Sequence, residues 1–182
     1  KELLKKFKPD EFYHLAAHHF SNENEIYNQN NKRFIEVNFL QTKNIIELIL
    51  NYKKDCKFLF CGSSHMFSPK KNEKYTLINE KNNYEPKNYY GLTKAAGVNL
   101  VKYFRNFREF LGYNVILFNH ESPKRPKDFV SRKITNFVAN TRLKIKENMS
   151  NKKLKINNIN SLVDWSHAKD IVMGMHLVLQ KS

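Results

Sequence analysis

The chain has 182 residues, 41% hydrophobic and 27% charged, and its 32 Lys and Arg against 17 Asp and Glu give a net charge of +15. This length suits one domain of ordinary size, and the apolar content is too high for a disordered chain. No stretch is long and apolar enough to cross a membrane, and residues 1–6 lack the apolar run of a secretory signal. The two cysteines lack the spacing of metal ligands, so no metal site is expected. So few cysteines suit a reducing compartment, and together these features predict a cytoplasmic chain without membrane association.

The positive charge raises the question of nucleic-acid binding, because clustered lysines and arginines neutralise phosphates. Here the lysines are spread through every segment among many asparagines, and no basic stripe interleaved with aromatic residues appears. The composition therefore predicts no nucleic-acid partner. An anionic small ligand would be served equally well by the same charge.

Helical and strand patterns alternate along the chain. The elements expected in the first half are a helix over 1–8 ended by Pro9, a buried strand over 12–17, a loop over 21–32, a helix over 34–52, a buried strand over 57–61 and a turn at 62–64. The elements expected in the second half begin with a polar connection over 69–88, a helix over 89–111 capped by Gly112 and a strand over 114–118. A loop with Pro123 and Pro126, a helix over 130–146, a short strand over 154–156 and a helix over 167–180 are expected to follow. This alternation predicts an α/β, Rossmann-like parallel sheet with helices on both faces.

The strongest local signal is the pair Tyr90 and Lys94 at the start of the predicted helix over 89–111. Residues four apart share one helix face, so the ammonium can stabilise a phenolate and lower the tyrosine pKa from about 10 toward neutrality. Such a tyrosine can take the proton of a sugar hydroxyl while hydride leaves the same carbon. The spacing alone also suits a surface pair, and the strand-end Ser63 before it favours the catalytic interpretation.

Four segments extend this pattern into a family resemblance. Residues 9–17, 117–125, 129–135 and 164–170 resemble the GDP-mannose 4,6-dehydratases of the extended short-chain dehydrogenase/reductase family. The resemblance implies that residues 1–182 form a partial NAD(P)-binding, Rossmann-like domain. That domain is expected to be incomplete, because the N-terminal strands and the C-terminal substrate region are missing from it.

The function implied by the resemblance is that of an NADP-dependent lyase, with NAD also possible, which converts GDP-mannose to GDP-4-dehydro-6-deoxy-mannose through transient oxidation at C4. Tyr90 would take the C4 hydroxyl proton, Lys94 would tune Tyr90 and hold the nicotinamide ribose, and Ser63 would bond the reacting hydroxyl. The implied cofactor-binding residues are Leu15, Ala16, Ala17, His18, His19, Tyr90, Lys94, His120 and Arg125. The implied substrate-binding residues are Ser63, Asn119, Glu121 and Lys133, and the protein is expected to form a homo-oligomer, a dimer or a tetramer.

Three departures from the family pattern keep alternatives open. His65 stands where the family carries the glutamate that removes the C5 proton, and Val163 stands where it carries a phosphate-binding arginine. The five glycines also leave the first strand–turn–helix without the loop that receives a pyrophosphate. The chain is therefore expected to be a piece of a longer dehydratase, with His65 as the C5 base. The alternatives are another sugar-nucleotide epimerase or reductase, or a truncated, non-catalytic relative that binds NADP poorly.

Overall fold

A computed structural model of the chain describes residues 1–19, 31–68, 76–146, 153–156 and 159–181. Contacts divide the chain into two units, one of residues 1–118 with 172–182 and one of residues 119–171. None of the helices within the described ranges is long and apolar enough to cross a membrane.

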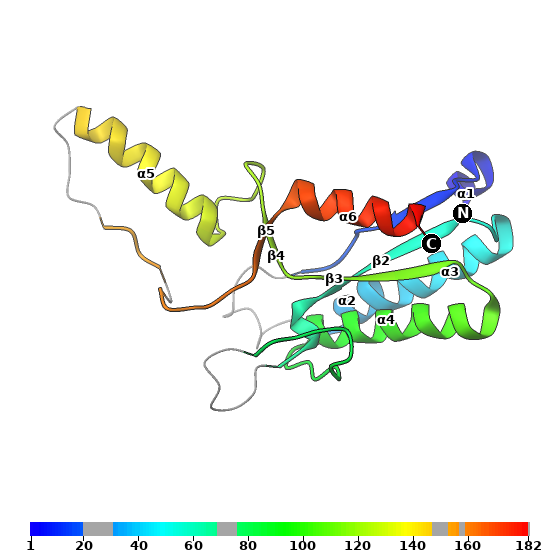
Figure 1. The fold of residues 1–182 in the computed structure, drawn as a ribbon. Helices are drawn as coiled ribbons and strands as arrows, with labels where there is room; N and C mark the ends of the chain where they lie inside the picture. Colours follow the sequence, from blue (N-terminus) through cyan, green and yellow to red (C-terminus); the bar gives the residue numbers. More distant parts are fainter. Residues whose placement is uncertain (20–30, 69–75, 147–152, 157–158, 182) are drawn as a thin grey trace. The chain divides into compact units, whose positions relative to one another are not determined.

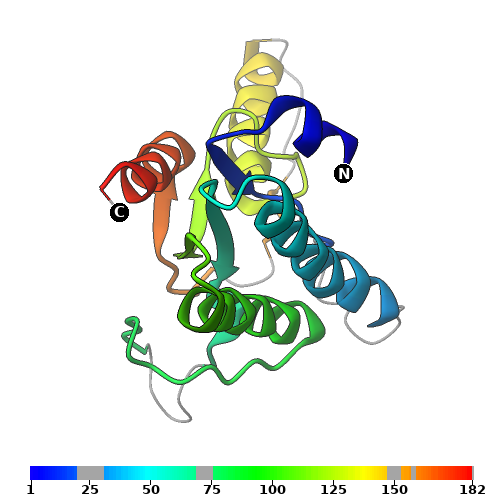
Figure 2. The same cartoon turned by 90° about the vertical axis from the view of Figure 1, so that its right-hand side faces the viewer.

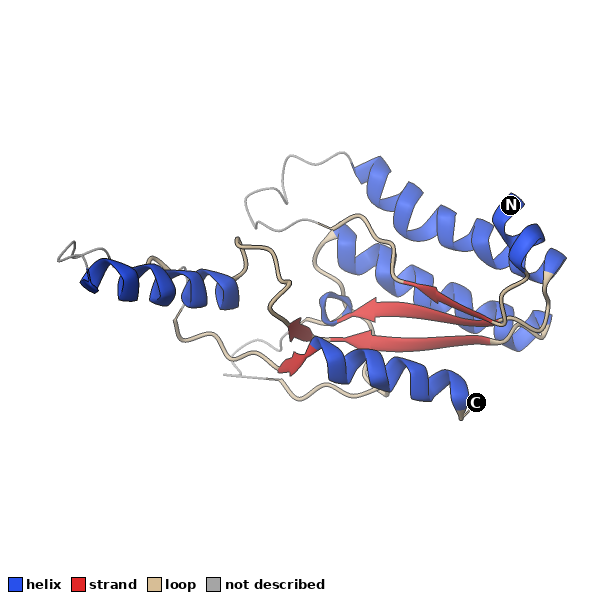
Figure 3. Ribbon diagram, turned by 90° about the horizontal axis from the view of Figure 1, so that it is seen from above, coloured by secondary structure: helices blue, strands red, loops and turns tan. Residues whose placement is uncertain are grey.

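The first unit is built on a parallel sheet with the strand order β1-β2-β3. Its strands are β1 (Glu11–His14), β2 (Lys57–Ser63) and β3 (Gly112–Leu117). Helices α3 (Gln41–Tyr52) and α4 (Tyr89–Arg108) cover one face, and the part of α6 (Ala168–Gln180) that belongs to this unit lies over the other (Figures 1 and 3). The predicted Rossmann-like sheet with helices on both faces is thereby confirmed.

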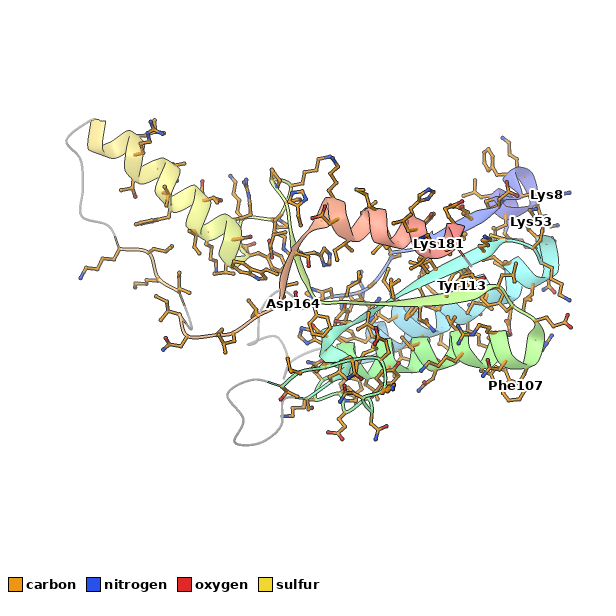
Figure 4. All side chains as sticks on the ribbon, in the orientation of Figure 1. Lys8, Lys53, Phe107, Tyr113, Asp164 and Lys181 are labelled. Atoms are coloured by element: carbon orange, nitrogen blue, oxygen red, sulfur yellow. The ribbon has the colours of Figure 1, made fainter. Side chains whose placement is uncertain are left out.

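The core lies between the sheet and the helices α3 and α4, which run side by side (Figure 2). Phe58 and Phe60 of β2 are no more than 1% exposed and belong to one buried apolar cluster with side chains of both helices. Gly97 lets α4 approach the sheet closely, because a Cβ there would overlap the Phe60 ring. Phe107, on the last turn of α4, is instead 71% exposed and points away from the sheet (Figure 4).

The helical segments before β2 differ from a single regular helix. The chain begins with α1 (Glu2–Phe7), and Lys8 ends it in a left-handed conformation, with φ 40, directly before Pro9 as predicted. The helix expected over 34–52 begins earlier, as α2 (Asn31–Phe34), and continues through a π-helical segment, η2 (Ile35–Leu40), into α3. The wider turns of η2 place Asn38 on its buried side.

Two expected boundaries in the first unit are wrong. The strand expected over 12–17 stops at His14, whose pairing with Phe60 is the last between β1 and β2. The helix expected to end at Gly112 ends at Arg108, where Glu109 takes the left-handed conformation with φ 52 and its N–H bonds the carbonyl of Phe104. Gly112 begins β3 instead, where a Cβ would come within 2.7 Å of the Phe110 ring.

The second unit contains a parallel pair of short strands and one long helix. The strands are β4 (Asn119–Glu121) and β5 (Trp165–His167), and the helix is α5 (Val130–Lys146), which has the predicted bounds. The strand expected over 154–156 is wrong, because no described strand pairs with these residues. Residues 165–167 pair with β4 instead, so the last helix begins one residue later than expected, at Ala168.

Candidate active site

The carboxyl end of β2 and the first turn of α4 bring three of the predicted catalytic side chains together. Ser63, Tyr90 and Lys94 are 7%, 9% and 3% exposed. The Tyr90 hydroxyl forms a hydrogen bond with Ser63, and the Lys94 Nζ lies 5.8 Å from the centre of the Tyr90 ring. The predicted shared helix face of Tyr90 and Lys94, and the predicted nearness of Ser63, are both observed.

The electrostatics of this cluster correct one expectation. Burial raises the pKa of Tyr90 above its ordinary value, and the hydrogen bond with Ser63 opposes that rise only in part. The predicted lowering by Lys94 is wrong here, because the Lys94 ammonium donates to the carbonyl oxygen of Cys61 at 2.8 Å. Burial in turn lowers the pKa of Lys94 to about 8. Tyr90 is therefore a protonated phenol at neutral pH.

The loop after β1 carries the five residues expected along the cofactor, Leu15, Ala16, Ala17, His18 and His19. Its last described residue reaches the cluster: the ring centres of His19 and Tyr90 lie 4.7 Å apart and the rings are nearly perpendicular. Leu15 and Ala16 are exposed, whereas Ala17 and His18 are half-buried. The loop thus places an imidazole against the phenol and leaves its first residues open to solvent.

Asn38, which the sequence analysis did not single out, holds this loop in place. Its Oδ1 accepts from the His18 N–H at 2.7 Å, and its Nδ2 donates to the His18 carbonyl at 3.0 Å. The same Nδ2 lies 3.2 Å from the Thr93 hydroxyl, beside Lys94 in α4. Asn38 is 1% exposed. A lone amide inside the apolar run of residues 37–40 is the sequence signal that could have identified it.

A buried histidine extends the same network. His14 is 3% exposed, and its Nε2 lies 3.0 Å from the Thr42 hydroxyl. Thr42 donates its own proton to the Asn38 carbonyl, so His14 must donate through Nε2. Burial lowers the pKa of His14 to about 4. The ring is therefore neutral at pH 7 and acts as a structural hydrogen-bond donor below the loop.

His65 occupies the turn η3 (Ser64–Met66), directly after β2. Its ring centre lies 5.5 Å from that of Tyr90, and its backbone N–H donates to the Ser63 hydroxyl oxygen at 3.2 Å. The residue is exposed to solvent, and its partial burial lowers the pKa of His65 below its ordinary value. The predicted C5 base thus lies beside the predicted C4 base.

Gly91 lets α4 come close to this turn. A Cβ at Gly91 would overlap the carbonyl oxygen of His65 and lie 2.8 Å from its carbonyl carbon, and backbone atoms cannot turn aside as a side chain can. We expect Gly91→Ala to lower the free energy of unfolding by about 3 kcal/mol, as overpacking does. Chemical denaturation of the variant measures this loss.

Gly174→Ala in α6 is the matched control, because a Cβ there meets nothing within 4 Å. Alanine favours a helix over glycine by about 1 kcal/mol, so this variant should be as stable as the parent chain or more stable. Equal stability of the two variants would contradict the close approach at Gly91.

The remaining predicted site residues lie in the second unit. Asn119, His120 and Glu121 form β4. The Glu121 carboxylate accepts a hydrogen bond from Ser131 and lies 3.3 Å from the Arg125 Nε, while Lys133 is exposed on α5. Glu121 is thus held within its own unit. The cofactor and substrate roles of these residues stay predictions.

The donors of the first unit fit one end of a nicotinamide dinucleotide. An ammonium has three N–H donors, of which Cys61 takes one, so Lys94 can also bond ribose hydroxyls. Residues 11–40 contain no glycine that would let backbone N–H groups approach phosphates, so the sequence of this segment does not match a pyrophosphate-binding loop.

Similar proteins agree with the resemblance in the sequence. The GDP-mannose 4,6-dehydratase sdnI of Sordaria araneosa is 31% identical over 182 residues, which is 99% of this chain and 31% of that protein. The GDP-mannose 4,6-dehydratase of Vibrio cholerae is 32% identical over 186 residues, 98% of this chain and 46% of its own length. The chain thus spans half or less of the length of these relatives.

Solved structures show the same fold. UDP-glucuronic acid 4-epimerase from Bacillus cereus, in complex with UDP-glucuronic acid and NAD, matches with a TM-score of 0.78 and 19% identity over 98% of this chain and 51% of that one. RMD from Pseudomonas aeruginosa, complexed with NADPH, matches with a TM-score of 0.78 and 21% identity over 94% of this chain and 57% of that one. A family model described as GDP-mannose 4,6 dehydratase matches residues 1–182. The chain belongs to the GDP-mannose 4,6 dehydratase family.

Proposed function

We propose that residues 1–182 are part of the NADP-binding domain of a GDP-mannose 4,6-dehydratase and carry the group that oxidises the sugar at C4. The observation that carries the proposal is the buried cluster of Ser63, Tyr90 and Lys94 at the end of β2. The family match along the whole chain supports a GDP-linked sugar as the substrate.

Each member of the cluster has a role in the first step. Tyr90, once deprotonated, takes the proton of the C4 hydroxyl, and its hydrogen bond with Ser63 favours the phenolate. Lys94 contributes the contact with the nicotinamide ribose. A bound nicotinamide dinucleotide would supply the redox chemistry, accepting the C4 hydride and later returning it to C6.

The second step needs a base at C5, whose proton becomes acidic next to the C4 ketone. When the base takes that proton, the C5–H electron pair forms a C5=C6 double bond, and the C6 hydroxyl leaves with a proton as water. His65 is the candidate, because it follows Ser63 in η3 and its ring lies beside Tyr90. An imidazole is a competent base near neutral pH.

The imidazole also favours a second candidate function. The dehydratases that this sequence resembles carry a carboxylate at the position of His65, and an imidazole differs from a carboxylate in reach and charge. Epimerases and reductases of sugar nucleotides need the C4 chemistry of Tyr90 and Lys94 but no elimination. A C4 epimerase or reductase is therefore the alternative.

GDP-mannose carrying deuterium at C4 tests the proposal against this alternative. Dehydration moves the deuterium to C6, so we expect one deuterium in the methyl group of the product for each turnover, measured by NMR and mass spectrometry with NADP present. Deuterium found only at C4 would favour the epimerase or reductase. No reaction that depends on the dinucleotide would contradict both functions.

A further inference from the structure

Asn88 connects the start of α4 to the ring of His65. Its Oδ1 accepts the N–H of Gly91 at 2.8 Å and so caps the helix, while its Nδ2 lies 3.2 Å from the His65 Nδ1. Turning the amide over would place its NH2 group against the Gly91 N–H, donor against donor. The helix cap therefore fixes which amide atom faces the histidine.

An amide nitrogen can only donate, so the His65 Nδ1 must accept. A neutral imidazole carries a single proton, which must then lie on the other ring nitrogen. We infer that Asn88 is a positioning residue that holds His65 as the neutral imidazole protonated on Nε2.

The surroundings of the ring agree with this form. Among the residues that the structure describes, the titratable groups that face it are Tyr90 from α4 and His19 from the loop after β1, whose ring centres lie 5.5 and 6.5 Å away. An imidazolium would carry a proton on Nδ1 as well, which would face the Asn88 Nδ2 donor against donor. The Asn88 contact therefore disfavours protonation of His65. The lowered pKa of His65 has the same direction.

The consequence for catalysis rests on the proposed function. In this form His65 presents an N–H to the sugar, which suits a hydrogen bond to a substrate oxygen. It cannot take the C5 proton on Nε2 until the ring proton has moved to Nδ1 and the Asn88 contact is broken. Asn88 thereby favours C4 oxidation over elimination in this chain.

Two variants of Asn88 keep the helix cap and change what faces the ring. Asn88→Asp can still accept the Gly91 N–H, and its second oxygen now accepts from Nδ1, which moves the proton from Nε2 to Nδ1. Asn88→Ser also caps helices well but leaves Nδ1 without its amide donor. Both variants should therefore retain the stability of the parent chain.

Nitrogen-15 NMR of histidine-labelled protein reads the ring form without any activity. We expect Nδ1 of His65 to be bare in the parent chain, protonated in Asn88→Asp, and exchanging between both forms in Asn88→Ser. His14, held by Thr42, is the internal reference and should keep its proton on Nε2 throughout. A protonated Nδ1 in the neutral ring of the parent chain, or identical spectra of all three proteins, would overturn the inference.

A second experiment tests the consequence for catalysis. It measures the exchange of the C5 proton of GDP-mannose for deuterium in D2O, with NADP present. Because a net hydrogen bond of ordinary strength corresponds to about fivefold in an equilibrium, we expect Asn88→Asp to raise the exchange rate by about fivefold or more. An unchanged rate beside a changed ring form would overturn the catalytic part of the inference. The expected NMR pattern with no exchange in any protein would contradict the proposed function and support the ring assignment.

Discussion

Tyr90→Phe is expected to lower turnover of a GDP-sugar by about 10³-fold, because a positioned acid–base group contributes about 10² to 10⁴ in rate. The change removes one hydroxyl, which is hydrogen-bonded to Ser63, so the free energy of unfolding should fall by about 1 kcal/mol or less. Steady-state kinetics with GDP-mannose and NADP measure the first effect, and chemical denaturation measures the second.

Tyr89→Phe is the matched control for this loss. Tyr89 is the neighbouring residue in α4, and it is 42% exposed where Tyr90 is buried. The same atom is removed from the same turn of the helix, and turnover should stay within about twofold of the parent, since surface changes away from a site have small effects. Comparable losses in the two variants would contradict the assignment of Tyr90 as the base for the C4 hydroxyl.

Local patterns in the sequence predict the parts of this site that depend on a single element. Tyr90 and Lys94 share a face because their spacing matches one helical turn, and Ser63 ends a strand because an apolar run stops at small residues. Patterns of this kind also predict α5 with its bounds. They depend on neighbouring residues only, so no tertiary contact is needed to recognise them.

The parts that could not be predicted depend on contacts between distant residues. The Lys94 ammonium bonds the Cys61 carbonyl, Asn38 bonds the backbone of His18, and β5 exists because it pairs with β4. Three residues are too few to show a strand periodicity, and a helical spacing does not reveal which acceptor an ammonium will find. The Tyr90 pKa is therefore shifted in the direction opposite to the prediction, although Tyr90 and Lys94 share a helix face and lie near Ser63 as predicted.

Lys94→Met is expected to stabilise the fold at pH 7 while it removes activity. Burial lowers the Lys94 pKa from 10.5 to about 8, so the unfolded chain holds this proton more tightly. That difference means that the buried ammonium destabilises the folded parent by about 3 kcal/mol, which Lys94→Met would recover. The variant also loses the hydrogen bond to the Cys61 carbonyl, which reduces the gain by about 1 kcal/mol. We expect the free energy of unfolding to rise by about 2 kcal/mol, measured by urea denaturation.

The pH dependence separates this cause from a general gain in packing. Below pH 8 both states of the parent carry the proton, and the full cost of burying the ammonium is present. Between pH 8 and 10.5 the folded parent releases the proton while the unfolded chain keeps it, so this contribution makes the parent more stable as pH rises. The advantage of Lys94→Met should therefore shrink across this range. Lys102→Met removes a half-buried ammonium from the same helix. This control variant should keep the parent's increase in stability between pH 8 and 10.5. A Lys94→Met protein less stable than the parent at pH 7 would show that the Cys61 contact outweighs the burial of the charge.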